Sequence, residues 1–149
     1  MMATHAQDGR VAWIGLRPAR RAGMTPVERA EIGLDGLAGD HGRPGKRALT
    51  LLQAEHLPVI AGLLGTGEVC APTLRRNILV SGLNLIALRK SRLCLGEAVL
   101  EITGPCAPCS RMEEALGPGG FNAVRGHGGW CAAVVTPGMV AVGDLVTPG

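Results

Sequence analysis

The chain has 149 residues and a mass of 15.4 kDa, the size of one domain, so a second independent core is not expected. Leu, Val, Ile and Phe make up about a quarter of it, more than disordered proteins contain. A net charge of +3 is far below the excess typical of nucleic-acid-binding domains. With two Trp, one Phe and no Tyr, the chain also offers little surface on which bases could stack.

The sequence carries no sign of a membrane or secretory location. No apolar run is as long as a membrane span, and the first ten residues, MMATHAQDGR, lack the hydrophobic centre of a signal peptide. We therefore expect a cytoplasmic protein with no membrane partner. The cysteines are odd in number in a chain large enough to form its own core, so we expect reduced thiols rather than a disulfide framework. These cysteines are Cys70, Cys94, Cys106, Cys109 and Cys131.

The 23 glycines and 10 prolines predict many turns between short elements, which favours a β-rich domain over a helical bundle. Residues 1–10 are expected to form a disordered tail and residues 11–149 a single domain. The elements predicted in the first half are a strand over 11–16, a basic loop, a weakly alternating segment over 31–40, a strand over 48–52 and a helix over 53–64 that ends at Gly65.

The second half of the chain is dominated by apolar and alternating segments separated by turn residues. The predicted elements are a strand over 78–80, a hairpin of 93–95 with 98–103, a short helix over 110–116 and a last hairpin of 130–136 with 139–146. Short strands with two modest helices indicate an α+β fold, mainly β, in which a small barrel-like sheet carries a few short helices.

The segment GPCAPCSRMEE, residues 104–114, carries the sharpest chemical signal. It lies between a predicted strand and a predicted helix, so Cys109 is expected at a helix N-terminus, with Arg111 close by in sequence. Free N–H groups and a cation stabilise a thiolate, which is the nucleophilic and metal-binding form of cysteine. We therefore predict sulfur transfer or ligation of a soft metal at Cys109. Ordinary packing is the simpler interpretation of Cys70, Cys94 and Cys131.

Two other interpretations of the Cys-x-x-Cys pair remain open. A thioredoxin-like redox motif also lies between a strand and a helix, but such domains need longer βαβ units than this chain offers. A structural zinc site would give a non-catalytic, zinc-stabilised domain. Its ligands would be Cys106, Cys109, His127 and Cys131.

Basic residues fall in short groups rather than in one extended stripe, which suits a small phosphorylated ligand. Residues 41–47, HGRPGKR, combine cations with glycines that allow a close approach of the backbone to an anion. An ordinary solvated turn explains the same residues equally well.

Several short motifs, in order along the chain, resemble the MOSC domain, named for the C-terminal domain of molybdenum cofactor sulfurases. The resemblance covers roughly residues 11–146. Each motif is weak alone, and their order makes the set specific. The motifs are GLAGDH at 36–41 with GKR at 45–47, RNILVSG at 76–82, PCSRM at 108–112 and a closing VGD strand at 142–144.

The resemblance implies a largely β-barrel fold with a single family cysteine, matched here by Cys109. In relatives this cysteine is linked to carrying sulfur or to ligating molybdenum of a molybdopterin-type cofactor, including enzymes that reduce N-hydroxylated compounds. The residues that match positions near the family's cofactor pocket are Lys46, Arg47, Asn77 and Arg111. A solvated turn at 46–47, a turn cap at Asn77 and a helical pair of Arg111 with Glu114 are the ordinary alternatives.

The chain departs from the better-understood relatives in being a bare domain. Pyridoxal phosphate is not implied, because the desulfurase domain that binds it in the sulfurases has no counterpart here. Either the site is more open than in those relatives, or a homodimer or a separate partner protein completes it. A sulfur donor or a redox protein is the partner expected. Cys106 is an addition, interpreted as a resolving thiol, a second sulfur acceptor or a packing residue. An interaction module that has lost its activity is a further alternative, which the scarcity of aromatic anchors disfavours.

Overall fold

The computed structural model describes residues 4–19, 23–41, 44–106 and 110–149, with backbone alone over 110–112. The strands are β1 (Gly9–Leu16), β2 (Thr25–Val27), β3 (Arg29–Gly33), β4 (Gly36–Leu37), β5 (Leu49–Gln53), β6 (Ile78–Ser81), β7 (Arg92–Leu95), β8 (Ala98–Pro105), β9 (Trp130–Thr136), β10 (Gly138–Ala141) and β11 (Leu145–Pro148). The helices are α1 (His56–Leu64), α2 (Ala71–Leu74), α3 (Ser110–Leu116) and α4 (Gly120–Val124), with a 3-10 turn η1 (Leu85–Leu88).

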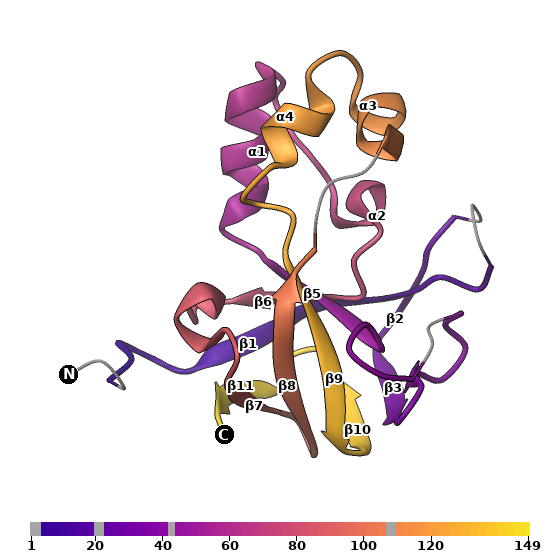
Figure 1. Cartoon of the computed structure of the whole chain (residues 1–149), viewed down its shortest axis with the longest axis vertical. Helices are drawn as coiled ribbons and strands as arrows, with labels where there is room; N and C mark the ends of the chain where they lie inside the picture. The colour runs from indigo at the N-terminus through magenta and orange to yellow at the C-terminus, as the bar shows by residue number, and fades with distance from the viewer. Residues whose placement is uncertain (1–3, 20–22, 42–43, 107–109) are drawn as a thin grey trace.

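A closed barrel forms the body of the molecule. Its strands follow the order β11-β7-β8-β9-β5-β6-β1, and pairing of β1 with β11 closes the ring. β5 and β6 are parallel, so the chain must cross over between them, and α1 and α2 lie in this connection. The four helices gather at one end of the barrel, beyond the upper ends of β8 and β9 (Figure 1). The predicted fold class, mainly β with a barrel-like sheet and a few short helices, is confirmed.

The barrel encloses one apolar core, and a second, smaller cluster lies under the helices. Every residue of β5 is buried, as expected for a short apolar strand with neighbours on both sides. The helical cluster brings together Leu52, Ile60, Leu74 and Val124, each fully buried. Because β5 contributes to both clusters through Leu51 and Leu52, the helices are packed against the barrel rather than loosely attached.

Several element boundaries agree with the sequence patterns, and two do not. α1 ends at Leu64, and Gly65 adopts a left-handed conformation with φ of 71°, as the glycine predicted. The helix begins at His56 rather than at residue 53, because Gln53 continues β5 and pairs with Val80 of β6. β1 begins at Gly9, inside the predicted tail, because its first residues pair with β11.

The predicted hairpin of 130–136 with 139–146 is wrong. β9 pairs with β8 and β5, whereas β10 pairs with β3 in a separate small sheet of β10, β3 and β4. The segment expected as one closing strand is broken at 142–144 by a turn, in which Gly143 has φ of 94° and the Asp144 carboxylate accepts a hydrogen bond from Ala141 N at 2.8 Å. Local alternation is the same on both sides of this turn, so it could not show that the two halves join different sheets.

In the described residues, no helix is long and apolar enough to span a bilayer.

Candidate functional site

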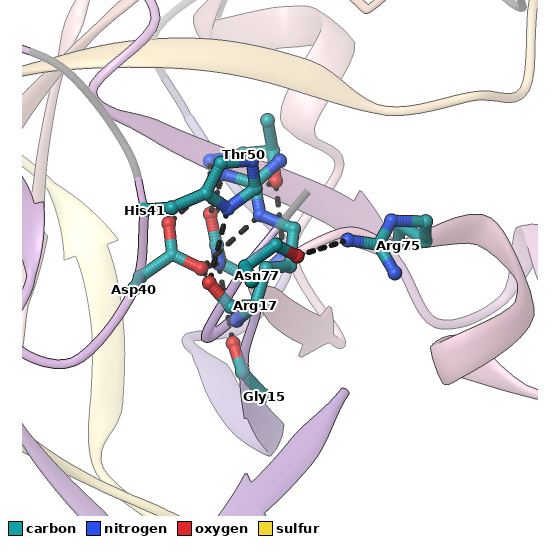
Figure 2. Close-up of polar contacts among 8 residues, drawn as sticks. Gly15, Arg17, Asp40, His41, Thr50, Arg75 and Asn77 are labelled. Atoms are coloured by element: carbon teal, nitrogen blue, oxygen red, sulfur yellow. Dashed lines mark hydrogen bonds and ion pairs between the residues drawn. The ribbon is translucent and has the colours of Figure 1, made fainter. Parts of the chain in front are cut away.

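A buried polar network joins the end of β1, the residues after β4, and the starts of β5 and β6 (Figure 2). Its centre is Asn77, which has no solvent exposure. The Asn77 amide oxygen accepts hydrogen bonds from the backbone N and the hydroxyl of Thr50, both at 3.1 Å. Its amide nitrogen donates to the Gly15 carbonyl at 3.2 Å and to the Asp40 carboxylate at 3.1 Å. The Asn77 side chain therefore has protein partners for both of its polar atoms.

Arg17 and Asp40 form a two-point ion pair within this network. The Arg17 guanidinium donates from Nε to Asp40 Oδ1 at 3.1 Å and from Nη2 to Oδ2 at 2.9 Å, and the Arg17 backbone N donates to Oδ1 at 2.6 Å. Burial would raise the pKa of Asp40, but the hydrogen bonds and charge of Arg17, with help from Asn77, lower it below its ordinary value. Asp40 is therefore held as a carboxylate and fixes the Arg17 side chain.

A second polar feature is a pair of cysteines at the junction of β8 and β9. Cys106 Sγ lies 3.0 Å from Cys131 Sγ, and both residues are buried, with exposed fractions of 9% and 8%. Cys131 is opposite Gly104 in the antiparallel register of β8 and β9, and Cys106 follows Pro105, the last residue of β8. The Cys106 backbone N donates to the Gly129 carbonyl at 2.9 Å, which extends the pairing and holds the two cysteines side by side.

Two glycines allow the chain before β9 to lie against this cysteine pair. Gly129 has φ of 92°, and a Cβ there would lie 2.1 Å from the Leu51 carbonyl oxygen. A Cβ at Gly128 would lie 2.9 Å from the Cys106 carbonyl oxygen. A side chain at either position would push the loop away from β5 and β8. At these two glycines the chain is thus a closely packed support for the cysteines.

Three arginines act electrostatically on the cysteine pair. A hydrogen bond from the Cys106 thiol lowers the pKa of Cys131 to about 6, and the same bond raises the pKa of Cys106. Burial opposes the shift at Cys131, whereas the positive charges of Arg47, Arg76 and Arg17 favour its thiolate. The hydrogen bond between the two thiols and the nearby arginines therefore favour a thiolate at Cys131, with Cys106 keeping its proton.

Arg76 is the arginine most closely fitted into this region. Its Nε donates to the Gly128 carbonyl at 2.6 Å and its Nη1 to the Leu74 carbonyl at 3.1 Å. Its Nη2 is buried and has no hydrogen-bond partner in the described residues, as is also true of His127 Nδ1. A buried guanidinium N–H without a partner is costly, so it marks a place where an anionic group would be stabilised.

The structure does not assemble the proposed zinc site from its described members. Cys106, His127 and Cys131 are all described, yet no group of three or more His, Cys, Asp or Glu able to hold a metal is found among the described residues. The His127 ring instead contacts the His56 ring edge-on, at a centroid distance of 5.3 Å. Cys109, the fourth member, lies outside the described residues.

The residues predicted from the sequence are distributed unevenly around these features. Arg47 is exposed and acts electrostatically on both cysteines. Lys46 is also exposed, and its backbone carbonyl accepts a hydrogen bond from the Thr103 hydroxyl. Asn77 is the centre of the buried network. Cys109 lies outside the described residues, and Arg111 is described by its backbone alone, within α3, which begins one residue after Cys109.

Three residues of this region were not singled out as site residues by the leading sequence interpretation. The sequence favours a packing role for Cys131, contains Arg76 only within the RNILVSG motif, and places Arg17 directly after the first predicted strand. The available signal was the order of residues at the strand ends, because Arg17 follows β1, Arg76 precedes β6 and Cys131 lies near the start of β9. Only the barrel register brings these strand ends together.

The sequence pattern that defines the MOSC domain family matches residues 33–147, so this chain belongs to the MOSC domain family. No curated protein sequence matches it. Among solved structures, it is similar to the YuaD protein from Bacillus subtilis, with a TM-score of 0.81 and 19% identity over 94% of each chain.

Two further similar structures carry the same protein name. YiiM from Geobacillus stearothermophilus has a TM-score of 0.78 and 17% identity, over 95% of this chain and 75% of that one. YiiM from Escherichia coli has a TM-score of 0.74 and 22% identity, over 94% of this chain and 69% of that one. At these identities the likeness concerns the fold.

Proposed function

We propose that the chain binds a molybdopterin-type cofactor, with Cys109 as a thiolate ligand of the molybdenum. The observation that carries the proposal is the positive charge that Arg17, Arg47 and Arg76 bring to Cys131, together with the buried Arg76 Nη2, which has no hydrogen-bond partner among the described residues. Membership of the MOSC family supports the association with this cofactor. The protein is proposed to act in the cytoplasm.

The described residues fit such a group in their chemistry. A molybdopterin carries a phosphate, and guanidinium groups are suited to hold it by charge-assisted hydrogen bonds. Molybdenum prefers soft sulfur ligands, and a thiolate is one. The orphaned N–H of Arg76 offers a donor that no group in the described protein uses.

Each residue has a distinct role in this proposal. Arg76 donates from its buried Nη2 to an anionic oxygen, and the exposed Arg47 guanidinium interacts with the same anionic group from the solvent side. Lys46 and Arg111 are proposed to add further cationic contacts. Asn77 positions rather than binds, because its buried amide orients Asp40, which in turn fixes Arg17. A second copy of the chain or a partner protein is proposed to cover the exposed side.

When bound, the cofactor would supply two-electron oxygen-atom chemistry, which suits reduction of N-hydroxylated compounds. The part of this chain in that reaction is to hold the cofactor's anionic groups, to keep Cys109 ionised and to provide cations that stabilise negative charge on a departing oxygen.

The test is metal and pterin analysis of the protein purified from a host that makes the cofactor. We expect molybdenum and pterin in the parent and their loss in Cys109→Ala, with Cys94→Ala as the matched cysteine control. Arg47→Ala should lower the content more than Arg92→Ala, an exposed arginine on β7. Equal molybdenum and pterin in the parent and in Cys109→Ala would refute the proposal.

Sulfur carriage by Cys109 is the second candidate, and the proximity of two further thiols, Cys106 and Cys131, favours it. Sulfane sulfur measured on the same preparations separates the two functions. Cyanolysable sulfur that is present in the parent, absent in Cys109→Ala and unaccompanied by molybdenum would select sulfur carriage.

A further inference from the structure

The cysteine pair of Cys106 and Cys131 is placed for a reaction between its own two sulfurs. Their Sγ atoms are 3.0 Å apart, so they must approach by only about 1 Å to reach the covalent S–S distance of about 2.05 Å. Their backbones are held in place by the β8 and β9 pairing and by the hydrogen bond from Cys106 N to the Gly129 carbonyl. Little chain entropy remains to be lost when the two sulfurs join.

The surroundings favour a reactive thiolate in this pair. Arg47 and Arg76 contribute positive charge to both sulfurs, and Arg17 adds to it at Cys131. Each cysteine exposes less than a tenth of its surface, so only a small reagent can reach a sulfur. A packing role alone does not require two thiols in contact and under the electrostatic influence of two arginines.

We propose that Cys106 and Cys131 form a reversible disulfide when the protein meets a small hydroperoxide, and that this bond is a redox modification site of the domain. The proposal does not depend on cofactor binding. It also differs from a Cys-x-x-Cys redox motif, because the partner of Cys106 is Cys131 across the strands rather than Cys109 along the chain.

The chemistry balances in two steps. The Cys131 thiolate attacks one oxygen of hydrogen peroxide, the O–O bond breaks, hydroxide leaves and takes a proton from solvent, and the sulfur becomes a sulfenic acid. The Cys106 sulfur then attacks the Cys131 sulfur, the S–O bond breaks, and the leaving hydroxide takes the Cys106 proton as water. In sum, two thiols and one peroxide give one disulfide and two waters, and a dithiol reductant reverses the bond.

The bond would link the two ends of a segment that contains Cys109, α3 and α4. Positions 106 and 131 are 25 residues apart, so a disulfide closes a loop of that span and restricts the unfolded chain. It also removes the negative charge of the pair from beside Arg47 and Arg76. Oxidation should therefore raise the melting temperature and leave these two arginines with fewer anionic neighbours.

The experiment uses the full chain, treated with an equimolar amount of hydrogen peroxide, blocked with N-ethylmaleimide and digested with trypsin without reduction. Cleavage at Arg92, Arg111 and Arg125 gives a peptide 93–111, with Cys94, Cys106 and Cys109, and a peptide 126–149, with Cys131 alone. We expect these two peptides to be linked, with fragmentation placing the bond at Cys106, and dithiothreitol to release them.

Variants keep the result unambiguous. Cys109→Ser and Cys94→Ser should retain the link in full, whereas Cys106→Ser should lose it. A bond from Cys106 to Cys109 in the parent, a bond from Cys109 to Cys131, or both Cys106 and Cys131 blocked as free thiols after treatment would each overturn the proposal. The peptide map of the parent protein tests the Cys106–Cys131 disulfide even if Cys106→Ser fails to fold.

Discussion

The buried network around Asn77 and the cysteine pair around Cys131 lie close together in the barrel, yet they treat polar groups in opposite ways. In the network, donors and acceptors are matched, and the Asp40 carboxylate balances Arg17. Around the cysteines, positive charge is in excess, and Arg76 has a buried N–H without a partner in the described residues. Matched polar groups stabilise a fold, whereas unmatched ones mark a place prepared for a ligand or a reaction.

Arg17 connects the two regions. Its guanidinium is fixed by Asp40 in the network, and its charge still favours the Cys131 thiolate. The buried network around Asn77 therefore positions the Arg17 cation that acts on the cysteine pair. Substitutions in each region, and the pH dependence of stability, separate these two contributions.

Of the substitutions in the buried network, Asn77→Ala should lower the free energy of unfolding most. The change leaves the Thr50 N–H, the Gly15 carbonyl and one side of the Asp40 carboxylate buried with fewer partners, so we expect a loss of about 4 kcal/mol in the free energy of unfolding. Urea unfolding measures it. Asn84→Ala, at an exposed asparagine whose side chain makes no cap hydrogen bond, should change stability by less than about 0.5 kcal/mol. A comparable small loss for Asn77→Ala would contradict the central position given to it.

Arg17→Met should cost less, about 3 kcal/mol, because it removes the Arg17–Asp40 ion pair but keeps the hydrogen bond from Asn77 to Asp40. The variant should also raise the pKa of Asp40. Urea unfolding at neutral pH and at pH 4 measures both effects, and Arg29→Met, at an exposed arginine of β3, is the matched control. If Arg17→Met and Arg29→Met lose equal stability, the ion pair contributes nothing.

The two regions should respond to pH in different windows. The lowered pKa of Asp40 means that its contribution is present above its ordinary value of 3.8 and is lost as the pH falls through the lower, folded value. The lowered pKa of Cys131, about 6 instead of 9.0, gives stability that is full above pH 9 and is lost as the pH falls toward 6. The raised pKa of Cys106 removes stability above pH 9.

Unfolding free energies measured from pH 6 to pH 9 should therefore rise in the parent. Cys131→Ala should flatten this rise without changing the acid limb below pH 4, whereas Cys70→Ala, at an exposed cysteine, should leave both unchanged. If the free energy of unfolding of the parent does not change between pH 6 and pH 9, the pKa of Cys131 is not lowered in the folded protein.

Arg47→Ala should produce the smallest change, since this side chain is exposed and solvent screens its charge. We expect the ultraviolet absorbance of the thiolate to titrate at a higher pH by a fraction of a unit, with the free energy of unfolding unchanged. Arg92→Ala is the control. A thiolate titration that stays at the parent pH would assign the cationic influence to Arg76 and Arg17 alone.

Part of this structure could be predicted from local patterns. The apolar run of β5, the glycine that ends α1 and the hairpin of β7 and β8 around Gly96 depend on residues close in sequence. The last hairpin could not, because the same alternation serves β10 in one sheet and β11 in another. Family membership was also within reach of the sequence, since short motifs in a fixed order need no register to be recognised.

The sequence by itself determined a mainly β domain of the MOSC family, with cations and cysteines at strand ends. The tertiary structure alone decided which of them meet. Cys131 and Cys106 face each other, and the charges of Arg17, Arg47 and Arg76 act on Cys131, because the barrel aligns the ends of β1, β5, β6, β8 and β9. That alignment is a property of strand register between distant segments, and no local pattern encodes it.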